Sequence, residues 1–414
     1  MTADIRRSID AIWKIESAKI IAGLTRMVRD VSLAEDIAHD ALVAALEQWP
    51  ESGLPDNPGA WLMTAAKRRA IDQRRHAKLT ERKRDEIARR GAAATADPAD
   101  EDQIEDDVLR LMFMTCHPAL ATEARVALTL RLLGGLTTDE IARAYLVPEP
   151  TIAQRIVRAK KTLTDEHVPF EAPRGKALAD RLSSVLEVIY LVFNEGYAAT
   201  AGDDWLRPGL CDEALRLGRI LAELAPRESE VHGLVALMEI QASRSAARVG
   251  PSGEPVLLLD QDRARWDPLL IRRGLDALRR AESLGGADGP YALQGAIAAC
   301  HARARVAADT DWSLISSLYE RLGRVSPSPI VELNRAVAVA MASGPAAGLD
   351  LVEALVSEPS LKGYHLLPAV RGDFLFKLSR FDEAREEFER AASLTRNSRE
   401  RAFLLDRVKK CKVT

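Results

Sequence analysis

A short basic segment in the middle of the chain carries side chains that could recognise DNA bases. At helical spacing its polar residues fall mostly opposite an apolar stripe, and they comprise Thr151, Gln154, Arg155, Arg158 and Lys161. Arginine can pair with guanine edges and glutamine with adenine edges, whereas lysine contacts phosphates. The pattern therefore predicts a helix that enters the major groove of DNA through its polar face.

Two short helices joined by a tight turn would have to position that face. Thr138 suits the N-cap of the first helix, Pro148 cannot continue it, and Pro150 fits the first turn of the second. The second helix would be anchored by an apolar stripe that comprises Ile152, Ile156, Ala159 and Leu163. Because helix-turn-helix patterns also arise by chance, an ordinary pair of surface helices with a solvated charged face remains the alternative.

A second basic segment lies nearer the N-terminus. Residues 67–90 contain eleven Lys or Arg and four Asp or Glu, in a long predicted helix that follows a loop at Pro50–Pro58. Helices are also predicted at Ile5–Val28 and Leu33–Trp49, the latter with Ser32 as its N-cap. A basic helix is often only a solvated surface, but this clustering favours binding to nucleic acid.

Composition sets broad limits on fold and function. The 414 residues suffice for two or three domains, and the abundance of Ala, Leu, Arg and Glu favours an all-α fold. Segment 91–107, with seven acids and no base, predicts a flexible linker. The sequence has neither a membrane-spanning stretch nor a signal peptide, which indicates a cytoplasmic protein. The four cysteines and seven histidines match no metal or nucleophile motif, so we expect no enzyme activity, no metal and no cofactor.

Three motifs, in order, resemble the extracytoplasmic-function (ECF) family of bacterial RNA polymerase sigma factors. They are AEDIAHDALVAALEQW, NPGAWLMTAAKRRAIDQRRH and LTTDEIARAYLVPEPTIAQRIVRAKKTL. The first two are similar to sigma region 2 and the third is similar to region 4. The resemblance implies a region 2 helical bundle at 1–90 for polymerase binding and −10 recognition, the acidic linker at 91–107, and region 4 at 108–165 for −35 recognition.

The resemblance also implies roles for individual residues. The helix Ala34–Trp49 would bind core polymerase through Asp36, Asp40 and Gln48. The −10 element would be recognised and melted by Asp56, Asn57, Lys67, Arg68, Arg69, Arg74 and Arg75. The −35 element would be bound by the five polar residues of the basic segment, although Ala153 stands where relatives often carry a polar or basic residue. Trp49 and Trp61 are better explained as packing residues.

Residues 176–414 predict a C-terminal extension made of helix pairs. Three segments within it each predict a helix, a turn and a second helix, and the last has the small-large-small spacing of a tetratricopeptide (TPR) repeat at Ala384, Phe388 and Ala391. Such pairs bury their apolar faces by stacking on one another. We therefore expect a TPR-like α-solenoid, with an irregular α-bundle as the alternative.

The segment Pro251–Ile271 interrupts this repeat. Loops inserted in solenoids often bind partners, so we consider it a candidate regulatory loop, with Asp260, Asp262, Arg263 and Trp266 as its candidate residues. A salt-bridged plug between helical layers is the alternative. Together with the NEGY turn at Asn194–Tyr197, the extension resembles that of an ECF group with TPR-like extensions, which implies regulation in cis.

The expected partners are core RNA polymerase and promoter DNA, with a signalling protein on the extension as a further candidate and no membrane. A one-component transcription regulator with a solenoid sensor is the main alternative, but it leaves the first 90 residues unexplained. An RNA-binding scaffold is a second alternative, and the absence of RNA-stacking aromatic modules disfavours it.

Replacing Arg155 with alanine tests the predicted contact to a base. If Arg155 recognises one base of the −35 element, Arg155→Ala should cost about 1–3 kcal/mol of binding free energy, and only on promoters that carry that base. Binding to promoters substituted at each −35 position measures this. Equal weakening on every sequence would instead assign Arg155 to a phosphate.

Overall fold

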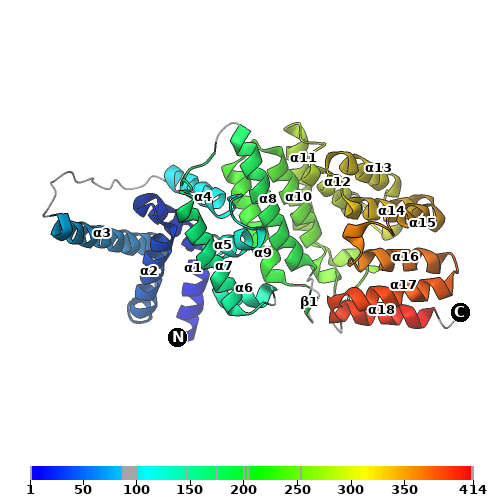
Figure 1. Ribbon diagram of the computed structural model, residues 1–414, viewed down its shortest axis with the longest axis horizontal. Helices are drawn as coiled ribbons and strands as arrows, with labels where there is room; N and C mark the ends of the chain where they lie inside the picture. The colour runs from blue at the N-terminus through cyan, green and yellow to red at the C-terminus, as the bar shows by residue number, and fades with distance from the viewer. Residues whose placement is uncertain are drawn as a thin grey trace. The chain divides into compact units, whose positions relative to one another are not determined.

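A computed structural model describes residues 2–85, 101–145, 147–173, 176–198, 201–202, 206–251 and 254–411. The chain folds as two compact units, Met1–Val188 and Ile189–Thr414, which are built almost wholly from α-helices (Figure 1). The predicted all-α class is therefore confirmed. None of the described helices combines the length and the apolar character that a bilayer span requires.

The helices of the first unit pack around α1. They are α1 (Thr2–Val28), α2 (Val31–Ser52), α3 (Pro58–Asp85), α4 (Glu101–Thr115), α5 (Thr122–Leu132), α6 (Thr138–Tyr145), α7 (Glu149–Asp165) and the first part of α8 (Lys176–Tyr197). Helix α1 contacts α2, α3 and α4, whereas α7 packs against α5 and α6. Fully buried alanines, among them Ala22 on α1 and Ala34, Ala38 and Ala41 on α2, let helices approach closely.

Helix α2 begins earlier than predicted because a different residue caps it. The Asp30 carboxylate accepts hydrogen bonds from the backbone N–H groups of Ser32 (2.8 Å) and Leu33 (3.0 Å). Asp30 has the extended backbone that an N-cap requires. The prediction of Ser32 as the cap is wrong, because Ser32 already lies in the first turn.

A capping box starts α6, one residue before the predicted cap. The Thr137 hydroxyl accepts a hydrogen bond from the Glu140 N–H (3.1 Å), and the Glu140 carboxylate accepts one from the Thr137 N–H (2.8 Å). This reciprocal pair satisfies two backbone donors that a helix start otherwise leaves open. The cap is therefore Thr137 and not Thr138.

The predicted loop at Pro50–Pro58 is shorter in the structure. Helix α2 continues through Pro50 to Ser52 and ends at Gly53, whose positive φ of 83° favours glycine. Pro58 is the first residue of α3, where its missing N–H is tolerated. The loop is therefore limited to residues 53–57.

Residues 91–100 of the predicted linker lie outside the described residues, and its predicted end at 107 is too late because α4 already begins at Glu101. Acidic side chains are favourable in a first helical turn, so the composition that suggested a linker also suits a helix start. Asp107 is fully buried in α4, where it forms ion pairs with Arg26 (2.8 Å) and Arg110 (2.7 Å). It is therefore part of the folded unit and not of a linker.

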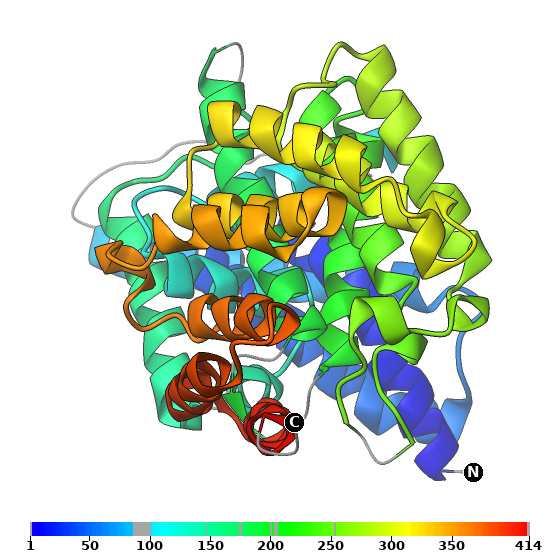
Figure 2. The ribbon, with the colours of Figure 1, turned by 90° about the vertical axis from the view of Figure 1, so that its right-hand side faces the viewer.

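The second unit is a solenoid-like stack of helices. It contains the rest of α8, β1 (Ala201–Gly202), α9 (Pro208–Leu224), α10 (Ser229–Ala242), α11 (Pro268–Ser283), α12 (Pro290–Arg303), α13 (Trp312–Val325), α14 (Pro329–Ser343), α15 (Pro345–Glu353), α16 (Leu366–Lys377), α17 (Phe381–Leu394), β2 (Arg396–Asn397) and α18 (Ser398–Lys410). From α9 to α18 each helix contacts the next, and Figure 2 shows the later helices side by side in chain order.

The predicted TPR spacing in α17 matches the burial of its residues. Ala384, Phe388 and Ala391 are all buried in one apolar cluster, which also includes Phe374 of α16. Strands β1 and β2 form a two-residue parallel pair within this helical unit. The predicted solenoid-like architecture of the extension is thus confirmed.

Candidate nucleic-acid interface

Helix α7 presents a polar face to solvent because its apolar stripe is buried. The four predicted stripe residues, from Ile152 to Leu163, are each at most 7 % exposed. On the other side, the structure leaves Gln154, Arg158 and Lys161 exposed and Thr151 and Arg155 half-buried. Pro148 precedes the helix and Pro150 lies in its first turn, as expected. The five candidate −35 residues therefore share one accessible side of a firmly anchored helix.

The candidate polymerase contacts lie on the outer side of α2. Asp36, Asp40 and Gln48 are all exposed, while the residues on the opposite side of the helix are buried. Trp49 is 1 % exposed and contacts the half-buried Trp61 edge-on, with 5.3 Å between the ring centroids. This agrees with the prediction that the two tryptophans are packing residues.

The structure describes the side chains of only some of the candidate −10 residues. Asp56 and Asn57 are exposed in the loop before α3, and the Asn57 side-chain oxygen accepts a hydrogen bond from the Ala60 N–H (3.0 Å). On α3, Arg68 is exposed and Lys67 and Arg69 are half-buried. Arg74 and Arg75 belong to the same helix, but their side chains lie outside the described residues.

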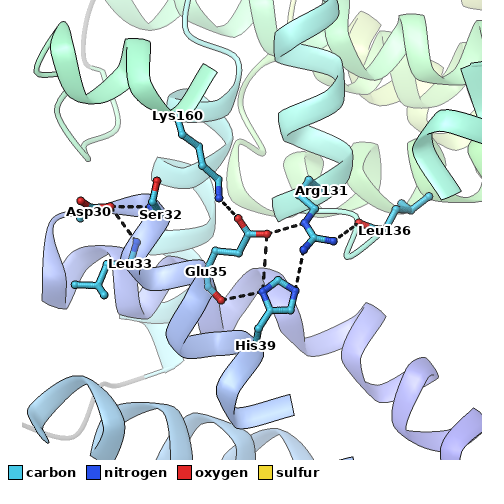
Figure 3. A network of polar contacts seen from close by, with 8 residues as sticks. All are labelled: Asp30, Ser32, Leu33, Glu35, His39, Arg131, Leu136 and Lys160. Atoms are coloured by element: carbon cyan, nitrogen blue, oxygen red, sulfur yellow. Dashed lines mark hydrogen bonds and ion pairs between the residues drawn. The ribbon is translucent and has the colours of Figure 1, made fainter. Parts of the chain in front are cut away.

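A polar network that sequence reasoning missed joins α2 to α5 and α7 (Figure 3). The Glu35 side chain is buried, and its carboxylate accepts hydrogen bonds from Arg131 Nε (2.6 Å) and from Lys160 Nζ. Arg131 also donates to the carbonyl oxygen of Leu136 (3.2 Å) and lies 3.0 Å from His39 Nε2. We call Glu35, His39, Arg131 and Lys160 the Glu35 network.

The charges within the Glu35 network support one another. Burial alone would raise the pKa of Glu35, but Lys160 and Arg131 outweigh it and hold that pKa below its ordinary value. Burial and the charge of Arg131 lower the pKa of His39. His39 Nδ1 lies 3.0 Å from the carbonyl oxygen of Glu35, so a neutral ring with the proton on Nδ1 satisfies both neighbours.

Smaller contacts reinforce the junction that the network forms. Lys14 of α1 forms an ion pair with Glu140 of α6 (3.2 Å). Gly135, with a φ of 64°, lies so close to α1 that a Cβ atom there would be 2.8 Å from the Ser17 hydroxyl. The chain around the turn after α5 is thus seated directly against the N-terminal helix.

The start of α8 is hydrogen-bonded to the helices that precede α7. Arg181 donates to the carbonyl oxygen of Phe113 (2.7 Å), and the Ser184 hydroxyl donates to that of Cys116 (2.7 Å). Arg125 of α5 forms an ion pair with Glu187 (3.1 Å). The first turns of the predicted extension are therefore part of the first unit.

In the second unit, the described part of the candidate regulatory loop after residue 253 contains two short 3-10 turns, Leu258–Asp260 and Arg263–Arg265. The loop ends where Asp267 caps α11, which begins at Pro268. Asp260 and Asp262 are exposed, whereas Trp266 is buried. Arg263 lies over the Trp266 ring at 4.9 Å from its centroid. Of the four candidates, the structure therefore brings only Arg263 and Trp266 together.

Family models match three consecutive parts of the chain. The model described as "Sigma-70 region 2" matches residues 17–80, and "Sigma-70, region 4" matches residues 110–163. Residues 181–282 match a family of unknown function, DUF6596. The two sigma matches contain the outer face of α2 and all but the last two residues of α7.

Relatives of known sequence agree with these matches. The uncharacterized protein R00370 of Rhizobium meliloti (strain 1021) is 42 % identical over 388 residues, which cover 93 % of this chain and 91 % of that protein. The probable ECF RNA polymerase sigma factor SigI of Mycobacterium tuberculosis (strain CDC 1551 / Oshkosh) is 26 % identical over 164 residues, 39 % of this chain and 56 % of that protein. The ECF RNA polymerase sigma factor SigK of Mycobacterium sp. (strain KMS) is 27 % identical over 161 residues, 36 % of this chain and 79 % of that protein.

Among solved structures, the yeast Tom70 crystal structure aligns with 99 % of this chain and 86 % of its own, at 12 % identity and a TM-score of 0.32, which is too weak to support an inference.

The matches to regions 2 and 4, in order and followed by a helical extension, are specific. The chain shares its family with R00370 and belongs to the ECF sigma factors that carry a C-terminal extension.

Proposed function

We propose that this sigma factor directs core RNA polymerase to promoters with two elements and is regulated by its own C-terminal extension. The observation that carries the proposal is the exposed polar face of α7 above a buried apolar stripe, within the match to region 4. Arg155, Gln154 and Thr151 would contact the −35 bases, while Arg158 and Lys161 would contact phosphates. The protein would act in the cytoplasm, where core polymerase and the chromosome are found.

The first 85 residues would supply the other two contacts. Asp36, Asp40 and Gln48 form an exposed polar strip on α2 that suits a basic or polar surface of the polymerase. Asp56 and Asn57, which precede α3, would contact unpaired bases of the −10 element. Basic residues of α3 would hold the melted strand through its phosphates.

The Glu35 network implies that the free protein is closed. Elements named −35 and −10 lie about 25 base pairs apart, roughly 85 Å along the DNA axis at about 3.4 Å per base pair. In the structure, a hydrogen bond joins Glu35 of α2 directly to Lys160 of α7. Helix α2 packs on α3, which would bind the −10 element. Helices α3 and α7 could therefore not both reach their elements while the Glu35–Lys160 contact persists, so promoter binding would require the network to break.

Contacts at the start of the extension support a role for it in this opening. Its first turns are bonded to α4 and α5 through Arg181, Ser184 and Glu187, and Arg131 of the network is on α5 as well. Any change that strains α8 would therefore act on α5, whose Arg131 binds Glu35. This coupling supports regulation in cis and needs no additional partner.

Removing the Glu35 charge should destabilise the closed first unit. Glu35→Gln leaves two partly buried cations without their carboxylate, which should lower the free energy of unfolding by about 3 kcal/mol. Chemical denaturation of the full chain measures this loss. Glu187→Gln is the matched control, because the Glu187 carboxylate is exposed, unlike that of Glu35, and its loss from the ion pair with Arg125 should cost less than about 1 kcal/mol. Equal losses in the two variants would show that the network has no special role.

In vitro transcription tests the proposed function. The full-length protein, added to sigma-free core polymerase on a library of genomic promoters, should yield transcripts from a sequence-defined subset, and only when the protein is present. Asp40→Arg, on the exposed face of α2, should reduce both core binding and transcript yield at least tenfold. Absence of transcripts together with absence of core binding by the unmodified protein would refute the proposal.

A further inference from the structure

Three arginines gather around two aromatic rings beyond the end of α10, in the second unit. The guanidinium carbon of Arg244 lies 5.7 Å from the ring centroids of both Tyr197 and Trp266. Arg248 lies 3.7 Å from the Tyr197 centroid, and Arg263 lies 4.9 Å from that of Trp266. We call Arg244, Arg248 and Arg263 the arginine cluster.

Backbone contacts fix the cluster in place. Arg263 donates to the carbonyl oxygens of His301 and Ala304 (2.7 Å for the latter) and to the Thr310 hydroxyl (3.1 Å). Arg248 donates to the carbonyl oxygen of Tyr197 (3.0 Å). These contacts join α8, the segment after α10 and the loop after α12, so the guanidinium groups are held by three separate parts of the fold.

Among the described residues, the charges of Arg244 and Arg263 are poorly compensated by acids, since Asp309 favours the charge of Arg263 only from a distance beyond that of an ion pair. Within the described residues neither Arg244 nor Arg263 forms an ion pair with a carboxylate, and the hydrogen-bond partners of Arg263 are neutral. The nearby acid Asp262 is exposed, and its carboxylate caps its own short turn through the Ala264 N–H (3.0 Å). Arg244 is only 8 % exposed. A buried guanidinium without an anion is unfavourable, and aromatic faces offset only part of that penalty.

Polar atoms without partners gather at the same place. Among the described residues, Arg244 Nε, Arg263 Nε, Trp266 Nε1 and His301 Nδ1 are buried and make no hydrogen bond. Burial and the charges of Arg244 and Arg263 lower the pKa of His301 to about 3, so its ring is neutral and Nδ1 is a donor in one of its two tautomers. Buried donors in native proteins are nearly always satisfied by protein, water or a bound ion. Three such donors, from Arg244, Arg263 and Trp266, around one cationic centre therefore indicate a missing acceptor.

We propose that the arginine cluster binds a small oxyanion, namely the carboxylate or phosphate group of a ligand. Arginine is the side chain best suited to such groups, because its planar guanidinium offers paired N–H donors. Tyr197 and Trp266 lie against the guanidinium faces, and the Nε atoms of Arg244 and Arg263 have no partner among the described residues, so these donors could bind the oxyanion. The site lies in the segment that matches the family of unknown function, and the inference does not depend on the sigma assignment.

Thermal unfolding of the full chain tests the site with inorganic phosphate and malonate as probes, each compared with chloride at equal ionic strength. Arg244→Gln removes one cation of the cluster. Arg279→Gln is the matched control, because Arg279 is exposed and pairs with Asp276 on the surface of α11. Phosphate or malonate should raise the unfolding midpoint of the unmodified protein and of Arg279→Gln, and the apparent Kd in Arg244→Gln should rise at least tenfold.

The two probes distinguish the sources of the oxyanion. A response to phosphate alone assigns a phosphorylated ligand, and a response to malonate alone assigns a carboxylate. Arg263→Lys is a second test, to be used if Arg244→Gln fails to fold. It keeps the positive charge but loses the guanidinium donors, so it should also weaken binding of the probes. Equal shifts in all variants would reveal a general salt effect, and no shift in the unmodified protein with either probe would mean no site. Either result would overturn the proposal.

Discussion

One buried carboxylate organises the first unit. Glu35 accepts hydrogen bonds from Arg131 and Lys160, which follow it by 96 and 125 residues along the chain. A buried carboxylate is tolerated only when cations or donors compensate for its lost hydration. Because each partner comes from a different helix, the requirement to satisfy one charge fixes α2, α5 and α7 against one another.

That constraint conflicts with the function of the family. The same α7 that exposes the proposed base-recognising side chains supplies Lys160 to the network, and the same α2 that exposes the proposed polymerase contacts supplies Glu35. The outer faces of both helices remain accessible, so polymerase or DNA could engage one face first. The binding free energy of that contact would then help to break the Glu35–Lys160 ion pair, because both charged groups regain hydration when they separate.

Local patterns predicted the helices and their outer faces, but not the contacts between distant segments. The buried stripe of α7 follows from apolar spacing alone, as does the exposure of Asp36 and Asp40 on α2. The predicted N-cap of α2 was wrong because Asp30 and Ser32 can both cap a helix, and their spacing in the sequence does not decide between them. Glu35 lies in an ordinary helical pattern, so nothing near it reveals its two cations. In the second unit, the sequence pattern indicates Arg263 and Trp266 but not Arg244. Arg244 comes close to Trp266 only when the chain after α10 folds against the loop.

The distance between α2 and α7 tests the closed arrangement most directly. Glu51→Cys and Asp165→Cys place labels on exposed positions at the ends of these helices, and the native cysteines Cys116, Cys211, Cys300 and Cys411 are buried. Dipolar or energy-transfer spectroscopy should give a single distance of a few tens of ångströms in the free protein, because Glu51 lies about 24 Å along α2 from Glu35. With core polymerase and promoter DNA the distance should be longer by several tens of ångströms. An unchanged distance in the promoter complex, or a long distance in the free protein, would contradict the account.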